Sequence, residues 1–139
     1  WKPQAAHKRT VPNEGVWRLD RGQTIKDMGV VDTVVANAGV GGGATSFSQI
    51  TIEIWRRVHA VNEEGVFFTL REACKHMVER AGKGDAGGSL IGVASLAGLE
   101  GAGRNEAFHA PQGNVVPMMR SNPLNHALAG LLASSIPPV

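Results

Sequence analysis

The spacing of hydrophobic and polar residues divides this chain into segments of different expected structure. Residues 30–39, VVDTVVANAG, are a short run rich in β-branched residues that ends in Asn and Gly, and this predicts a strand buried on both faces. A similar run at 89–95, SLIGVAS, predicts a second strand. Between them, apolar residues recur at helical spacing over 51–82, which predicts two helices or one helix bent near residues 62–65.

The order strand, helix, strand with a long crossover predicts a right-handed parallel βαβ unit. The fold class is therefore α/β. Residues 1–30 show no sustained period and contain turn formers throughout, so we expect a poorly ordered segment there and a single domain over 31–139.

Prolines complicate the interpretation of the C-terminal third. Pro111 is tolerated in the first turn of a helix, but Pro117 predicts that a helix over 108–121 kinks or stops. The apolar run LNHALAGLLASS, at 124–135, predicts a last helix.

Composition and charge exclude several classes of protein. The chain has 139 residues, 42% of them hydrophobic and 19% charged, which is typical of one globular domain, and its net charge of +2 gives no argument for a nucleic-acid partner. Its single cysteine, Cys74, excludes an internal disulfide and a cysteine-cluster zinc site, so we predict no metal centre and a reducing compartment.

No apolar stretch approaches the roughly 18 residues that span a membrane, and the N-terminus has no apolar signal-peptide core. We therefore expect a cytoplasmic protein without a membrane partner. Because the chain begins at Trp1 rather than Met, a fragment of a longer protein remains one interpretation.

One glycine-rich stretch matches a dinucleotide-binding pattern. GVGGGA at 39–44 satisfies G-x-G-x-x-G/A and follows a predicted strand. That mechanism needs the glycines to open a helix directly, whereas here a polar loop intervenes before Thr51. A flexible connection is the favoured interpretation.

Four short elements occur in a more specific order. They are ANAG at 36–39, Asn62 followed by GVF at 65–67, GGSLIGVAS ending at Ser95, and Phe108 with Gln112. Their order and spacing resemble the short-chain dehydrogenase/reductase family over about residues 31–121. The resemblance implies part of a doubly wound parallel, Rossmann-like sheet, and a family function of NAD(P)-dependent oxidoreduction of alcohols or ketones.

The resemblance also assigns roles to five residues. Asn37, Ala38 and Gly39 match the turn that lines the cofactor site. Asn62 matches the catalytic helix residue that holds a proton-relay water, and Ser95 matches the catalytic serine that hydrogen-bonds the substrate oxygen. Taken alone, each also has a structural interpretation as a turn former, a residue at a helix bend or a cap.

Two positions depart from the family pattern. Phe108 stands where the family has the tyrosine that moves the substrate proton, and Gln112 stands where it has the lysine that lowers the tyrosine pKa and holds the nicotinamide ribose. The chain contains no tyrosine at all. Histidine is the residue type that can exchange a proton near neutral pH, and His109 is adjacent, but in a helix its side chain is expected to point away from that of Phe108. The resemblance therefore implies an activity that is lost or strongly impaired.

A further departure concerns the cofactor and the partners. Nothing in residues 1–31 matches the glycine-rich turn that binds NAD or NADP in the family, so we expect weak or absent dinucleotide binding. The resemblance implies a homo-oligomer formed through the helices at 63–81 and 108–121.

Three interpretations of the function remain at this point: a working oxidoreductase, a pseudoenzyme that serves as an interaction or dimerisation module, and a decayed fragment without selected function. An esterase is excluded because GVASLAG is not the G-x-S-x-G elbow.

Overall fold

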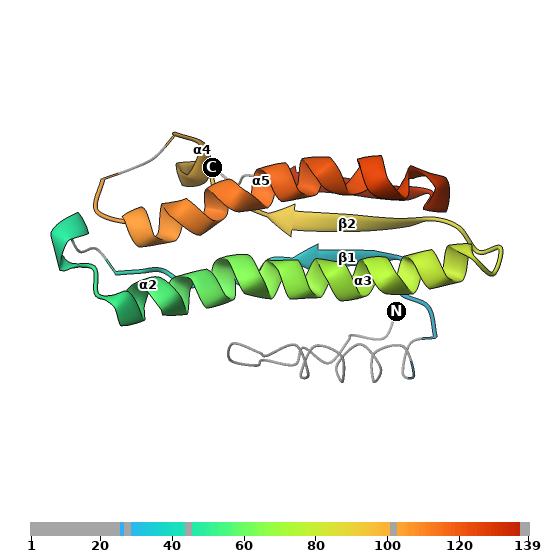
Figure 1. The fold of residues 1–139 in the computed structure, drawn as a ribbon, viewed down its shortest axis with the longest axis horizontal. Coiled ribbons are helices and arrows are strands. Elements are labelled where there is room, and N and C mark those ends of the chain that lie inside the picture. The colour runs from blue at the N-terminus through green and yellow to red at the C-terminus, as the bar shows by residue number, and fades with distance from the viewer. Residues whose placement is uncertain (1–25, 27–28, 44–45, 101–102, 137–139) are drawn as a thin grey trace, which may run out of the picture.

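The computed structural model describes residue 26 and residues 29–43, 46–100 and 103–136, with backbone alone at 123–126 (Figure 1). The segment 1–30, expected to be poorly ordered, lies almost wholly outside these residues, as does the last residue of the GVGGGA stretch.

The described strands form one parallel sheet. Strands β1 (Thr33–Ala36), β2 (Gly88–Val93) and β3 (Leu131–Ile136) lie in the order β1-β2-β3. Leu90, in the central strand, is opposite Val34 on one side and Ala133 on the other. The α/β class and the parallel βαβ unit are thereby confirmed.

The crossover from β1 to β2 is a long helical run (Figure 1). It consists of the short turn η1 (Phe47–Gln49), α2 (Ile52–His59), the π-helical segment η2 (Ala60–Glu64) and α3 (Gly65–Ala81). Thr51 begins α2 as its N-cap, accepting a hydrogen bond from the Ile54 N–H at 3.3 Å. This π-helical segment lies where the sequence predicts a bend in the helix, near residues 62–65.

The helix after β2 is longer than predicted. A short helix α4 (Ala97–Glu100) precedes α5 (Glu106–His126), and α5 continues through Pro111 and Pro117. The alternative that the helix stops at Pro117 is wrong, and Pro111 lies beyond the first turn. Each proline removes one helical hydrogen bond, at about 3 kcal/mol in a helix interior. Apolar burial offsets this cost, because Val115, Val116 and Met119 are all buried.

The predicted last helix at 124–135 is also wrong. After α5 and the turn η3 (Ala127–Ala129), Gly130 adopts a φ of +69° and the chain enters β3. A positive φ suits glycine and ends the helix. Leu131 is buried and Leu132 is 70% exposed, which is the period of a strand.

The core lies between the sheet and the two long helices. Its largest fully buried apolar side chains are Met77 on α3, Leu90 on β2, and Val115 and Met119 on α5. Gly92 allows α5 to approach β2 closely, since a Cβ there would lie 2.9 Å from Met119 Cγ and 3.0 Å from Val115 Cγ1.

The prediction that the first strand is buried on both faces is wrong. Val34 and Ala36 pack toward the core, whereas Thr33 is exposed and Val35 is 53% exposed. In the described part of the chain β1 is an edge strand, and α3 and α5 cover one face of the sheet.

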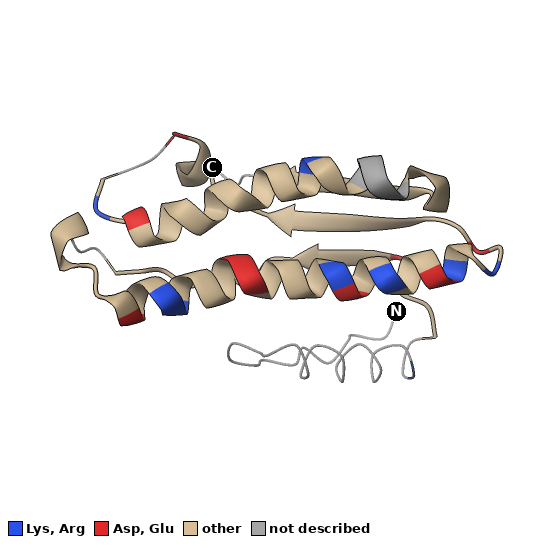
Figure 2. Ribbon diagram, viewed as in Figure 1, with Lys and Arg blue, Asp and Glu red and all other residues tan. Residues whose placement is uncertain are grey.

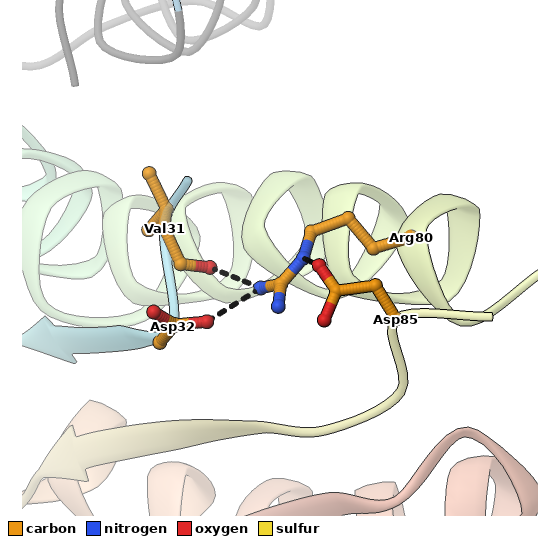
Figure 3. Close-up of polar contacts among 4 residues, drawn as sticks. All are labelled: Val31, Asp32, Arg80 and Asp85. Atoms are coloured by element: carbon orange, nitrogen blue, oxygen red, sulfur yellow. Dashed lines mark hydrogen bonds and ion pairs between the residues drawn. The ribbon is translucent and has the colours of Figure 1, made fainter. Parts of the chain in front are cut away.

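Arg80, near the end of α3, forms hydrogen bonds with residues at the start of β1 (Figure 3). Its Nη1 donates to Asp32 Oδ1 at 2.8 Å and to the Val31 carbonyl at 3.1 Å, and its Nε donates to Asp85 Oδ2 at 2.8 Å. The hydrogen bond from Arg80 lowers the pKa of Asp85. These contacts connect the helix end, the first strand and the turn that leads into β2.

Candidate functional site

The candidate residues lie where the strands end. In open parallel sheets, ligands bind outside the carboxyl ends of the strands. Asn37, Ala38 and Gly39 directly follow β1 and are exposed, and Ser95 follows β2 by two residues. The turn and the serine therefore lie at the same end of the sheet.

Asn62 holds the loop that follows β1. It is fully buried, its Nδ2 donates to the Val40 carbonyl at 3.0 Å, and its Oδ1 accepts from the Val40 N–H at 2.8 Å. Nearby, Arg57 Nη2 donates to the Gly41 carbonyl at 3.2 Å. The Asn62 amide is thus engaged by backbone, so its observed contacts position the loop.

Gly39 brings two of the candidate amides together. A Cβ at this glycine would lie 3.6 Å from Asn62 Oδ1 and 4.0 Å from Gln112 Nε2. Gln112 is 6% exposed, and its Oε1 is buried without a hydrogen-bond partner in the described structure. Gln112, which the sequence resemblance matches to the family lysine, is therefore a buried, neutral amide beside the predicted cofactor turn.

Phe108 lies one turn before Gln112 on α5 and is half-buried. Its ring packs edge-on to the His109 ring, with the centroids 5.9 Å apart and the planes at 73°. A phenyl ring neither donates nor accepts a proton, so Phe108 cannot act as the acid or base that the resemblance implies for its position. The ring contact also shows that the expectation of a His109 side chain pointing away from Phe108 is wrong.

Ser95 lies in a loop that packs closely against α5. Its Oγ accepts a hydrogen bond from the Ala97 N–H at 3.3 Å, as a cap would. A Cβ at Gly98 would lie 2.7 Å from Gly113 N and 2.8 Å from Gln112 Cβ. The close packing of Gly98 therefore fixes the loop that carries Ser95 next to Gln112.

Sequence reasoning missed a polar network that joins the π segment to α5. His59 Nδ1 lies 2.8 Å from Glu63 Oε2, and Asn114 Nδ2 donates to Glu63 Oε1 at 3.0 Å. The four-residue separation of His59 and Glu63 on a helix was an available signal. The link to Asn114 depends on tertiary packing.

A groove lies between α3 and α5, with a volume of about 350 Å³. Phe67 and Val78 line it and are 42% and 38% exposed. The Arg71 guanidinium also lines it, 5.2 Å from the Phe67 ring centroid. Burial raises the pKa of the Cys74 thiol, which faces the same groove.

A membrane-spanning helix and a metal cluster are both absent from the described residues. No helix among them is long and apolar enough to cross a membrane. No three His, Cys, Asp or Glu side chains there are grouped to hold a metal ion.

The sequence matches the family model for short chain dehydrogenases over residues 21–138. Similar curated proteins include the NADP-dependent (R)-specific alcohol dehydrogenase of Lentilactobacillus kefiri, 34% identical over 84% of this chain and 44% of that protein. The cyclohexanol dehydrogenase of Acinetobacter sp. strain SE19 is 29% identical over 82% of this chain and 43% of that protein. The meso-2,3-butanediol dehydrogenase of Serratia marcescens is 29% identical over 84% of this chain and 43% of that protein.

This chain therefore spans less than half the length of these relatives. Among solved structures, a 3-ketoacyl-(acyl-carrier-protein) reductase from Brucella melitensis, complexed with NADH, has the same fold. The TM-score is 0.85 at 24% identity, over 91% of this chain and 52% of that chain.

Proposed function

Because the chain belongs to the short-chain dehydrogenase family, we propose that it keeps the framework of an oxidoreductase site without the groups that transfer the proton. One observation carries this proposal. Phe108 and Gln112, which the sequence resemblance matches to the family tyrosine and lysine, are one turn apart on α5, and both side chains are neutral and unable to act as an acid at neutral pH. Loss of a positioned acid–base group typically lowers the rate by about 10²- to 10⁴-fold.

The proposal includes weak or absent binding of NAD or NADP. In the family the cofactor would meet the turn of Asn37, Ala38 and Gly39 and the residue at position 112. Gly39 is exposed and lies close to Gln112, so a ligand over the turn would meet both residues. Gln112 supplies no positive charge, however, and the glycine-rich stretch at 39–44 is followed by a polar loop before Thr51 instead of opening a helix directly. A bound nicotinamide would supply the hydride acceptor or donor.

The test is a dehydrogenase assay on the purified protein. Cyclohexanol and meso-2,3-butanediol are suitable substrates, since similar proteins are named for them, and NAD and NADP are each supplied in excess. We expect no turnover above that of a Ser95→Ala control. The Phe108→Tyr/Gln112→Lys double variant tests whether these two positions are what is missing. Turnover by the unmodified protein that exceeds the Ser95→Ala control would overturn the proposal.

A separate titration addresses the cofactor. We expect NADH and NADPH fluorescence to show no saturable enhancement at micromolar protein. Saturable enhancement would contradict the binding part of the proposal while leaving the catalytic part standing, because the assay reads only turnover.

We further propose a second role, a homo-oligomer formed through α3 and α5. The apolar groove between these helices supports it, together with the exposure of Phe67 and Val78. A specific interface buries about 800 Å² per partner, and we expect α3 and α5 together to supply that area. Light scattering after size exclusion should give a multiple of 14.6 kDa.

A matched pair of variants makes this test specific. Phe67→Asp, in the groove, should shift the protein to the monomer. Phe47→Asp, at a phenylalanine that is 70% exposed and lies outside the groove, should leave the mass unchanged. A monomer before any substitution would refute the second role.

The proposed compartment is the reducing cytoplasm. Cys74 is a free, buried thiol, which is the usual state of cysteine there. Localisation of a tagged chain to a secreted fraction would contradict it.

A further inference from the structure

Strand β3 lies at one edge of the sheet. It pairs with β2 on one side, and no described strand lies on its other side. The Ile136 carbonyl accepts from the Ala94 N–H at 3.0 Å, so the backbone groups of Ile136 point toward β2. Backbone groups alternate in direction along a strand, so those of Ala133 and Ser135 point away from β2. They form an edge, called here the β3 edge, that an approaching strand can pair with.

The sequence of β3 carries none of the usual protection of an edge strand. Natural edges are blocked by lysine, proline, a bulge or a short strand. β3 has six residues, LLASSI, without a charge or a proline, and it pairs with β2 in continuous register. Charged residues are frequent instead on α2 and α3 (Figure 2). The opposite edge differs, because β1 has only four residues and begins beside the ion pair of Arg80 and Asp32.

The exposed side chains of β3 are arranged symmetrically about Ser134. Leu132 is 70% and Ile136 49% exposed, and Ser134 between them is also exposed. Leu131 and Ala133 pack toward the core, so the three exposed side chains lie on the other face of the sheet. An apolar residue therefore lies two positions before Ser134 and another two positions after it. Such a strand is complementary to an antiparallel copy of itself.

We infer that the β3 edge binds the β3 edge of a second copy, antiparallel about a two-fold axis at Ser134. In this register Leu132 is opposite the partner's Ile136, on the same face of the sheet. Ala133 is opposite the partner's Ser135, and their outward backbone groups form a hydrogen-bonded pair. A shift by one residue would place opposed side chains on different faces, and a shift by two would remove both Leu–Ile pairs. This isologous contact closes at two copies.

The area of this contact limits its strength. Six residues at about 3.3 Å each make a strand only about 20 Å long. One pair of such strands buries less than the roughly 800 Å² per partner of a standard interface, so we expect a dissociation constant of about 0.1–1 mM. The contact is also separate from the α3–α5 groove, because those helices cover the core face and the β3 edge lies in the plane of the sheet.

The Ser134→Cys variant, in a Cys74→Ala background that removes the native thiol, tests the contact by disulfide formation. The backbone groups of Ser134 point toward β2, so it forms a non-hydrogen-bonded pair with its copy, whose Cα atoms are about 4.5 Å apart and within disulfide range. With oxidised glutathione and about 0.1 mM protein, it should cross-link at least about ten-fold faster than Ser48→Cys, an exposed serine on η1. Equal rates would overturn the inference.

A mixture of Leu132→Cys and Ile136→Cys, in the same Cys74→Ala background, tests the register. An affinity tag on one variant separates the mixed dimer from the two like dimers by mass. We expect the mixed dimer to dominate, since the two Leu132 positions are four residues apart along the paired strands, about 13 Å. Mixed and like dimers in statistical proportion would mean random collision and would count against the inference.

A charge at the two-fold axis gives a measurement that needs no cysteine. Ser134→Lys places like charges opposite each other, which weakens a cross-strand pair. In a Phe67→Asp background, which disrupts the proposed α3–α5 contact, sedimentation equilibrium at about 0.1–1 mM should show a mass rising toward twice 14.6 kDa. Ser134→Lys should suppress this rise, and Ser48→Lys should not. Circular dichroism establishes that each variant is folded.

Two results of the sedimentation experiment would overturn the inference. One is a monomer mass throughout this concentration range. The other is growth beyond the dimer, which would indicate head-to-tail pairing of β3 with the β1 edge of the next copy. Neither result bears on hydride transfer, and neither bears on the α3–α5 contact, which is read from the mass of the unmodified protein.

Discussion

Replacing Gln112 with methionine should stabilise the protein. Gln112 is 6% exposed, and its Oε1 is buried without a partner. An unsatisfied buried polar group costs about 1–3 kcal/mol, and methionine fills nearly the same volume without that group. We therefore expect the free energy of unfolding to rise by about 1–2 kcal/mol.

That change corresponds to a measurable shift in melting temperature. At about 4 °C per kcal/mol for a domain of this size, Tm should rise by about 4–8 °C. Scanning calorimetry and urea unfolding at pH 7 would each detect it. The matched control is Gln49→Met, an exposed glutamine whose Oε1 accepts from Ser46 Oγ at 2.9 Å, where we expect a change within about 0.5 kcal/mol.

A fall in Tm for Gln112→Met would refute the reasoning. It would mean that the Gln112 amide makes hydrogen bonds that outweigh its unpaired oxygen. Gln112→Lys supplies a second comparison, since a charge at this buried position should lower stability when no partner neutralises it.

Three further predictions concern contacts that hold the site in place. Gly98→Ala should destabilise the protein by about 1–3 kcal/mol, because the new Cβ would overlap the backbone at Gly113; urea unfolding measures it, and an unchanged midpoint would contradict the close packing. Asn62→Ala should cost about 1–3 kcal/mol, since it leaves the Val40 N–H and carbonyl unpaired, and hydrogen exchange at the Val40 amide should accelerate. The depressed pKa of Asp85 means that its stabilisation is present above the pKa of the unfolded chain and is lost as the pH falls through the folded-state value. Stability measured from pH 7 to pH 3 should therefore fall less steeply in Arg80→Ala, and equal slopes would contradict the role of Arg80.

Local patterns in the sequence predicted the parts of the fold that depend on neighbouring residues. The β-branched run before Asn37 and the run before Ser95 predicted β1 and β2, and the helical spacing between them predicted the crossover. Asn62 and the following glycine predicted the irregularity that the structure shows as the π turn at Ala60–Glu64. The order of these elements required a parallel arrangement, because a helical crossover returns the chain in the same direction.

For the candidate site, too, some features followed from the sequence and others only from tertiary packing. Spacing selected the candidate residues and composition gave the absence of tyrosine, whereas packing decided what the candidate side chains contact. The Asn62 amide binds the Val40 backbone, and Gln112 is buried close to Gly39. These contacts join residues that are 22 and 73 positions apart, and no local pattern encodes such pairs.

Tertiary contacts also decided the C-terminal third. Pro117 argues against a continuous helix, but the burial of Val115 and Met119 against the sheet outweighs the lost hydrogen bond. The segment after Gly130 has a helical composition, yet it forms β3 because the free edge of β2 offers it a hydrogen-bonded ladder. The exposure of Val35 follows from the same sheet: whether a strand is buried on one face or two depends on which segments cover it, and not on the residues of the strand.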